Sequence, residues 1–311
     1  MVSLVIQRYF TVTAKRSALW QPQLIAFALV VLVSISFTTQ AKSLAPAHNL
    51  SPSAEPQTLR IAVAANFHPV LAKIAQRYTA EHGTQLELIS GASGTLFQQI
   101  YHGAPFDIFL SADSVRPAKL AQLDLIVANS RTTYATGKLA LWSPAKTIKD
   151  ITDISTVLNE GGRLAIANPK IAPYGKAAFE ALSHFKLWQQ VQGKLITGIN
   201  IGQTFAQTRS QAAQIGIVAQ SQLVLNGLSG YPLPQESYQP IAQQLVIVKR
   251  SAKLASAKHF VSFLLSDDIQ QFITSYGYQS TIDKNLSAMH GVNPSQVNAV
   301  LGNQPWVINR G

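Results

Sequence analysis

Four short segments of this 311-residue chain combine small side chains with hydroxyl and amide groups, and each directly precedes a predicted helix. The segments are Ala65-Asn66-Phe67, Ser90-Gly91-Ala92-Ser93-Gly94, Ala172-Pro173-Tyr174-Gly175 and Asn200-Ile201-Gly202-Gln203. Backbone N–H groups in the first turn of a helix have no intrahelical acceptor and carry the positive end of the helix dipole. If the four segments meet in one cleft, they would bind an anion without any Arg or Lys side chain.

Ordinary helix capping is the alternative role for these polar side chains. Ser and Asn are common N-caps, whose side-chain oxygen accepts a hydrogen bond from their own helix. The two roles are compatible, because a hydroxyl group that caps a helix can also donate outward. Both roles require elements that place the segments at the starts of helices.

Short apolar strands alternate with amphipathic helices along most of the chain. Strands are predicted at 59–65, 86–89, 106–110, 138–142, 163–167, 195–199, 215–219 and 242–248. Helices are predicted at 69–82, 96–101, 117–123, 176–191, 203–214 and 255–276, and Gly83 is a helix stop. This alternation predicts an α/β fold with parallel sheets covered by helices on both faces. In such sheets ligands bind beyond the carboxyl ends of the strands, where helices begin.

The N-terminal region has the pattern of an export signal. Arg8, Lys15 and Arg16 precede the apolar run 24–37, and Thr39-Gln40-Ala41 follows it with small residues at the two positions that a signal peptidase reads. A cleaved signal peptide is therefore predicted over residues 1–41. An uncleaved membrane anchor is the alternative, but the run is shorter than the roughly 20 residues that span a bilayer.

Two further segments lack the strand–helix pattern. Residues 42–57 contain Pro46, Pro52 and Pro56 among Ser and Ala, which predicts a flexible linker. Residues 280–311 have no clear periodicity and are interpreted as a C-terminal tail.

Composition excludes several classes of function. The net charge is +11, but the basic residues are scattered, so no nucleic-acid-binding patch is predicted. The chain has no Cys, and its seven His residues form no paired metal-ligand motif. There is no Walker A pattern, and Ser93 is not flanked as in the G-x-S-x-G motif of hydrolases. We therefore expect neither a cofactor nor catalysis.

Five stretches of the chain resemble periplasmic molybdate-binding proteins. They read AANFHPVLAKIAQRY, SGASGTLFQQIYHGAPFDIFLSAD, ATGKLALWS, NPKIAPYGKAAFEAL and NIGQTFAQ. The resemblance runs from about Leu59 to Tyr278. It implies a two-lobed type II periplasmic-binding-protein fold, in which each lobe is a mostly parallel sheet flanked by helices and the ligand cleft lies between the lobes.

The same resemblance implies where the lobes divide. Lobe 1 would comprise residues 58–136 plus 243–279, and lobe 2 would comprise residues 137–242. The chain would cross between them near 134–138 and near 238–243.

Carried over by position, the resemblance also implies a set of ligand-binding residues. Ala65 and Asn66 would supply donors from the first segment, and Ser93 would supply its hydroxyl and backbone N–H. Tyr174 and Ile201 would supply backbone N–H groups from the third and fourth segments. Some family members place a Tyr hydroxyl where this chain has Ala219, so that donor is missing here unless Tyr174 replaces it.

The implied function is high-affinity capture of molybdate or tungstate in the periplasm and delivery to the membrane permease of an ABC importer. The protein would act as a monomer, without a cofactor, and would hold molybdenum only as the oxyanion. Molybdate is fully deprotonated at neutral pH and needs donors only, whereas hydrogen phosphate needs an acceptor for its proton. None of the four segments contains Asp or Glu, and the nearby Asp113 is interpreted as structural. Sulfate or another tetrahedral oxyanion is the alternative ligand, and an enzyme that uses Ser93 is the alternative class.

Overall fold

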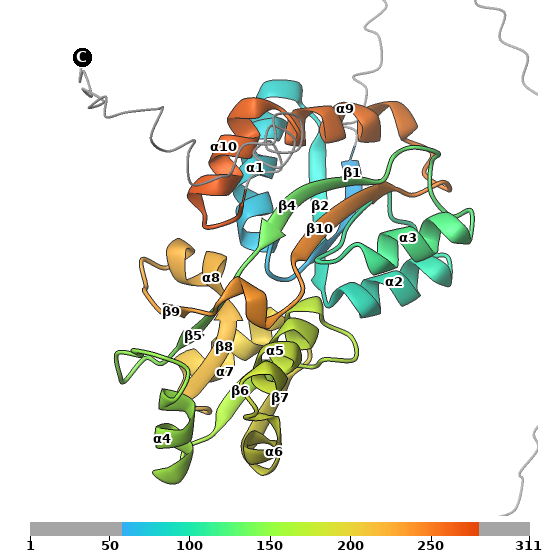
Figure 1. Ribbon diagram of the computed structural model, residues 1–311. Helices are drawn as coiled ribbons and strands as arrows, with labels where there is room; N and C mark the ends of the chain where they lie inside the picture. The colour runs from blue at the N-terminus through green and yellow to red at the C-terminus, as the bar shows by residue number, and fades with distance from the viewer. Residues whose placement is uncertain (1–57, 280–311) are drawn as a thin grey trace, which may run out of the picture. The chain divides into compact units, whose positions relative to one another are not determined.

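The computed structural model describes residues 58–279, which form two five-stranded sheets with flanking helices (Figure 1). The predicted signal peptide (1–41), linker (42–57) and tail (280–311) lie outside the described residues. Within 58–279, none of the helices is both long enough and apolar enough to cross a membrane.

The sheet of the first lobe has the strand order β2-β1-β3-β10-β4. Its strands are β1 (Thr58–Ala64), β2 (Gln85–Gly91), β3 (Ile108–Leu110), β4 (Thr132–Gly137) and β10 (Ile241–Ile247). Strand β1 pairs in parallel with β2 and β3, whereas β10 runs antiparallel to β3 and β4. Its helices are α1 (His68–His82), α2 (Ser93–Tyr101), α3 (Val115–Gln122), α9 (Leu254–Leu264) and α10 (Asp267–Ser275).

The sheet of the second lobe has the order β7-β6-β8-β5-β9. Its strands are β5 (Leu139–Trp142), β6 (Leu164–Ala167), β7 (Leu195–Gly198), β8 (Ile215–Ala219) and β9 (Tyr231–Pro232). Strand β6 is parallel to β7 and β8, and β5 is antiparallel to β8 and β9. Its helices are α4 (Asp153–Asn159), α5 (Pro173–His184), α6 (Trp188–Val191), α7 (Ile201–Arg209) and α8 (Gln220–Leu225).

The chain crosses between the sheets twice. Strand β4 ends in the first sheet at Gly137 and β5 begins in the second at Leu139, so the outward crossing is at Lys138. The return lies between β9 and β10, over residues 233–240. Both crossings therefore involve strands next to each other in the first sheet, since β10 pairs with β4.

Helix α1 illustrates how the sequence pattern fixes an element. Val70, Leu71, Ile74 and Tyr78 recur at helical spacing and are all buried. The helix packs against α9. Gly83 ends α1 in the left-handed conformation with φ of 70° and donates its N–H to Thr79 O, which confirms the predicted stop.

Two helices that were predicted as continuous are each broken in two. The prediction over 176–191 is wrong because α5 ends at His184, Lys186 takes a positive φ of 59°, and α6 begins at Trp188. The prediction over 255–276 is wrong because α9 ends at Leu264 and α10 begins at Asp267. Asp267 and Asp268 lie in the first turn of α10, where carboxylates stabilise a helix start. Strands β4 and β9 and helices α4 and α8 were not predicted.

Gly175 brings the first turn of α5 into close contact with the end of β6, and this contact generates a stability prediction. A Cβ atom at Gly175 would lie 2.6 Å from the carbonyl carbon of Ala167, which is backbone and cannot move aside easily. We expect Gly175→Ala to destabilise the protein by roughly 1–3 kcal/mol, despite a gain of up to about 1 kcal/mol in helix propensity.

Urea unfolding followed by circular dichroism measures this change. Gly193→Ala is the matched control, because a Cβ atom there would meet no atom within 4 Å. Equal unfolding midpoints for the two variants would show that α5 does not need the close contact.

Candidate functional site

The four polar segments singled out from the sequence all line one small cavity. Two of them precede α1 and α2 in the first lobe, and two precede α5 and α7 in the second. The lining residues are Ala64, Ala65, Asn66, Gly91, Ala92, Ser93, Ala112, Ala172, Pro173, Tyr174, Asn200 and Ile201. All five predicted site residues are among them, and none of the twelve carries a formal charge at neutral pH.

Four backbone N–H groups at this cavity lack an acceptor within the described chain. They belong to Asn66, Ser93, Tyr174 and Ile201. Ser93 and Ile201 are the first residues of α2 and α7, and Tyr174 follows Pro173, the first residue of α5. These positions are where a helix exposes unpaired donors and its positive dipole end. The cavity is therefore surrounded by donors that need an acceptor.

Ala65 differs from the other four predicted residues. Its backbone N–H donates to Gly91 O at 3.0 Å, and it has no side-chain donor. In this structure Ala65 contributes its methyl group to the cavity wall. The donor expected from this residue is already used by the neighbouring strand.

Ser93 combines a free N–H with a hydroxyl group of fixed orientation. Its Oγ accepts a hydrogen bond from Ala112 N at 2.9 Å, so the hydroxyl hydrogen points to another acceptor. The side chain is buried. No His or carboxylate in the described chain is hydrogen-bonded to this Oγ, so Ser93 lacks the base that a nucleophile needs. The geometry makes Ser93 a hydrogen-bond donor.

Asn66 lies between the cavity and a cluster of buried polar side chains. Its Nδ2 is 2.9 Å from Gln243 Oε1, 3.2 Å from Tyr278 OH and 3.3 Å from Tyr174 OH. Asn66 and Gln243 are 1% and 0% exposed, and Asn66 Oδ1 is buried without a hydrogen-bond partner. Because Tyr174 belongs to the second lobe, the Asn66–Tyr174 contact joins the two lobes.

The Tyr174 hydroxyl is directed into this cluster. Gln243 Nε2 lies 3.3 Å from it, and a Cβ atom at Gly137 would collide with it. Burial raises the pKa of Tyr174 well above 10, and burial raises the pKa of Tyr278 to about 12. Both phenols are therefore neutral at neutral pH. The hydroxyl of Tyr174 takes part in contacts between the lobes, so the missing donor at Ala219 has no replacement from it in this structure.

Two residues that position parts of the site, Gln222 and Gln243, were not predicted from the sequence. Gln222 accepts from Ala219 N at 3.1 Å and donates to Ile201 O at 3.0 Å, which fixes the start of α7. Gln243 interrupts the apolar pattern of β10, and that interruption was the available signal for it. Asn200 Oδ1 accepts from Gln203 N at 2.9 Å, so the capping role is confirmed for Asn200.

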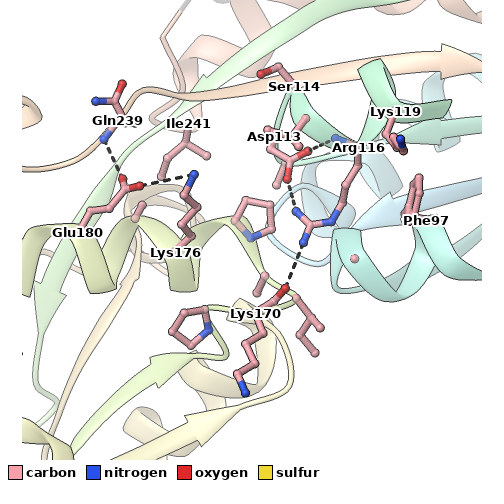
Figure 2. A pocket seen from close by; sticks show the side chains of 18 of the residues that line it. Phe97, Asp113, Ser114, Arg116, Lys119, Lys170, Lys176, Glu180, Gln239 and Ile241 are labelled. Carbon is pink, nitrogen blue, oxygen red and sulfur yellow. Dashed lines mark hydrogen bonds and ion pairs between the residues drawn. The ribbon is translucent and has the colours of Figure 1, made fainter. Parts of the chain in front are cut away.

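A larger, charged opening adjoins the cavity and shares Ala112, Ala172 and Pro173 with it. Figure 2 shows Arg116 between the Asp113 carboxylate and the carbonyl of Lys170. Asp113 Oδ1 also accepts from Arg116 N at 3.1 Å, so Asp113 has a structural role at the start of α3. Gly94 N donates to Ile171 O at 2.9 Å, and this bond joins the lobes on the side of the charged opening.

The donor set suits a small, deprotonated anion better than a metal ion. The cavity offers N–H and O–H donors, whereas hard cations require oxygen ligands with lone pairs and zinc requires imidazole, thiolate or carboxylate. Across residues 58–279 there is no group of three or more His, Cys, Asp or Glu residues that could hold a metal ion.

Comparison with known proteins agrees with this geometry. Residues 59–279 match the family model of bacterial extracellular solute-binding proteins. The molybdate-binding protein ModA of Rhodobacter capsulatus is 39% identical over 221 residues, which cover 70% of this chain and 86% of that protein. The ModA of Azotobacter vinelandii is 37% identical over 235 residues, or 74% and 92% of the two chains.

The fold agrees as well. The solved periplasmic molybdate-binding protein of Azotobacter vinelandii superposes with a TM-score of 0.67 at 36% identity, over 71% of this chain and 98% of that chain. This likeness confirms the expected two-lobed α/β fold. Because the family model covers most of the described residues, the chain belongs to the bacterial extracellular solute-binding proteins.

Proposed function

We propose that this protein captures molybdate, or tungstate of the same shape and charge, in the periplasm and delivers it to the permease of an ABC importer. The observation that carries the proposal is the convergence of helix starts from both lobes on one uncharged cavity lined by unpaired donors. Two relatives that are 37% and 39% identical are named as molybdate-binding proteins, which supports the choice of ligand. The protein acts as a binding protein, without catalysis and without a cofactor.

In the proposed complex the anion is held by neutral donors from both lobes. Asn66 and Ser93 provide N–H groups from the first lobe, and Tyr174 and Ile201 provide them from the second. The Ser93 hydroxyl adds a donor because its oxygen already accepts from Ala112 N. An anion that bonds to both lobes favours their closure, and exclusion of water strengthens each of its interactions.

Selectivity follows from the absence of an acceptor in this donor set. Molybdate, tungstate and sulfate carry no proton, so each of their oxygens can accept from the site. Hydrogen phosphate would place an O–H group against donors, and no carboxylate lines the cavity to accept its proton. Sulfate also carries no proton, so it is the alternative ligand. Its tetrahedron is smaller than that of molybdate, and the fit to the cavity therefore distinguishes the two anions.

Thermal unfolding with a panel of anions tests this function. At about 100 times its Kd, a ligand adds about 2.7 kcal/mol of stability, or roughly 5–10 °C in Tm for a domain of this size. We expect this shift with molybdate and tungstate, and little or none with sulfate and phosphate. An equal shift with phosphate would contradict a site made of donors only.

Substitution of Ser93 tests the assignment of the donors. Ser93→Ala removes one hydrogen bond to a charged ligand, which is worth roughly 1.5–3 kcal/mol, or about 10- to 100-fold in affinity. Isothermal titration calorimetry with molybdate measures the change. Ser183→Ala is the control, because Ser183 is an exposed residue of α5. Wild-type affinity in Ser93→Ala would place the anion elsewhere.

Replacement of Asn66 by a negatively charged residue tests whether its side chain lies beside the anion. Asn66→Asp keeps the size of the side chain but puts a carboxylate in a buried position beside a dianion, where like charges repel strongly. We expect calorimetry to detect almost no molybdate binding. Tight binding by this variant would show that Asn66 does not face the anion.

The pH dependence of binding provides a further test. Among residues 58–279, Tyr174 is the only titratable side chain that lines the cavity, and burial raises its pKa well above 10. We therefore expect a constant affinity for molybdate from about pH 6 to about pH 9. Above pH 10 the tyrosines of the unfolded chain ionise while Tyr278, with a pKa of about 12, stays protonated in the folded state. The free energy of unfolding is therefore expected to fall as the pH rises from about 10 to about 12.

Calorimetry across this range, with circular dichroism to follow the folded fraction, checks the prediction. A tenfold change in affinity between about pH 6 and about pH 9 would reveal a titratable group in contact with the anion.

A further inference from the structure

A buried network of five side chains lies behind the cavity, where the chain crosses between the lobes. We call Asn66, Tyr134, Tyr174, Gln243 and Tyr278 the crossing network. Gln243 Oε1 lies 2.9 Å from Asn66 Nδ2 and 3.0 Å from Tyr134 OH. All five side chains are at most 3% exposed, so water cannot supply missing partners freely. The polar groups of the network must therefore find their partners among one another or at the adjoining cavity.

With Asn66 Nδ2 facing Gln243 Oε1, the network leaves one acceptor unpaired. Asn66 directs its Nδ2 toward Gln243, Tyr174 and Tyr278, and its Oδ1 is buried without a partner. A buried carbonyl without a hydrogen bond is costly. The Nδ2 end of the amide faces the crossing network and Asn66 also lines the cavity, which points to Oδ1 as the end on the cavity side. An acceptor there would repel a dianion.

Rotation of two amide groups by 180° exchanges this unpaired acceptor for a donor that an anion can accept from. The O and N atoms of Asn and Gln are distinguished only by their hydrogen bonds, so both orientations fit the same heavy-atom positions. If Asn66 and Gln243 both rotate, Gln243 Nε2 donates to Asn66 Oδ1 across the same 2.9 Å and to Tyr134 OH across the same 3.0 Å.

The tyrosines complete this rotated arrangement. Tyr134 donates to Ser111 O at 3.2 Å, and Tyr278 donates to Asn66 O at 3.0 Å. Tyr174 donates to the rotated Gln243 Oε1 across 3.3 Å. Each member then has a partner within the network, and Asn66 Nδ2 becomes a free donor on the cavity side.

We propose that Gln243 is a positioning residue that sets the anion specificity: its Nε2 holds Asn66 Oδ1 in the crossing network and so turns Asn66 Nδ2 toward the anion. This inference rests on the proposed function for the identity of the ligand. With Nδ2 in the cavity, the site offers only donors and favours an anion without protons. With Oδ1 there, the site would gain the acceptor that hydrogen phosphate needs. Gln243 therefore decides between the two classes of oxyanion without touching either.

Gln243→Glu tests the inference, because a carboxylate at this position can only accept. It would draw Asn66 Nδ2 back into the network and leave Oδ1 in the cavity. At about pH 8.5 both molybdate and hydrogen phosphate are dianions, so the added negative charge repels them alike and the ratio of their affinities reports the amide orientation. We expect the preference for molybdate over phosphate to fall at least about tenfold. An unchanged ratio in the folded variant would overturn the proposal.

Gln244→Glu is the matched control. Gln244 follows Gln243 in β10, is partly exposed, and contacts Thr133 and Arg131 rather than Asn66. The Gln244→Glu variant introduces the same charge one residue away. We expect its ratio of molybdate affinity to phosphate affinity to equal that of the wild type. A fall in the ratio equal to that of Gln243→Glu would mean that charge, not amide orientation, controls specificity, and would also overturn the proposal.

Neutron diffraction from deuterium-exchanged wild-type crystals grown with molybdate tests the orientation directly. It remains decisive if Gln243→Glu does not fold. We expect deuterons on Gln243 Nε2 that face Asn66 Oδ1 and Tyr134 OH. A Gln243 carbonyl that faces the Asn66 amide would overturn the inference. The same maps show whether molybdate occupies the cavity, so failure of the proposed function would be seen separately, as a cavity without molybdate.

Discussion

The unpaired backbone N–H groups at the starts of α2, α5 and α7, and just before α1, are the constraint on which the site depends. A buried donor without an acceptor is unfavourable, and four of them around one uncharged cavity create a strong demand for negative charge. The fold places these N–H groups around the cavity, because each of these helices follows a strand of one of the two sheets and starts at the carboxyl end of that strand. Fixed side-chain cations are not needed, so the charge of the ligand is matched by oriented dipoles.

The same constraint explains why two lobes are needed. A single helix start offers a few N–H donors that all point in one direction. A tetrahedral oxyanion has four oxygen acceptors that point in four directions. The two lobes supply donors from opposite sides, and contacts on either side of the cavity hold them together. Asn66 and Tyr174 join the lobes in the crossing network, and Gly94 N donates to Ile171 O on the side of the charged opening. With the anion bound as proposed, closure and ligand binding would use adjacent residues of the same helix starts.

Local sequence patterns predicted the parts of the molecule that local chemistry determines. The strands before α1, α5 and α7, the stop at Gly83 and the four polar segments were all identifiable from the sequence. The breaks at Lys186 and Ser266 were missed because apolar spacing continues across both. The crossing network was missed because Asn66 and Gln243 are brought together only by sheet pairing. Ala65 shows the limit of transfer by position, since its N–H is already bound to Gly91 O.

In the proposed complex, neutral donors from both lobes hold the anion in the small cavity, and the charged groups of the neighbouring opening do not. Anomalous scattering from tungsten in crystals grown with tungstate locates the anion. We expect one strong anomalous peak within hydrogen-bonding reach of Ser93 and Ile201, with a tungstate oxygen on each of the unpaired N–H groups. A peak beside Arg116 or Lys119 in the larger opening, with none in the small cavity, would contradict the account.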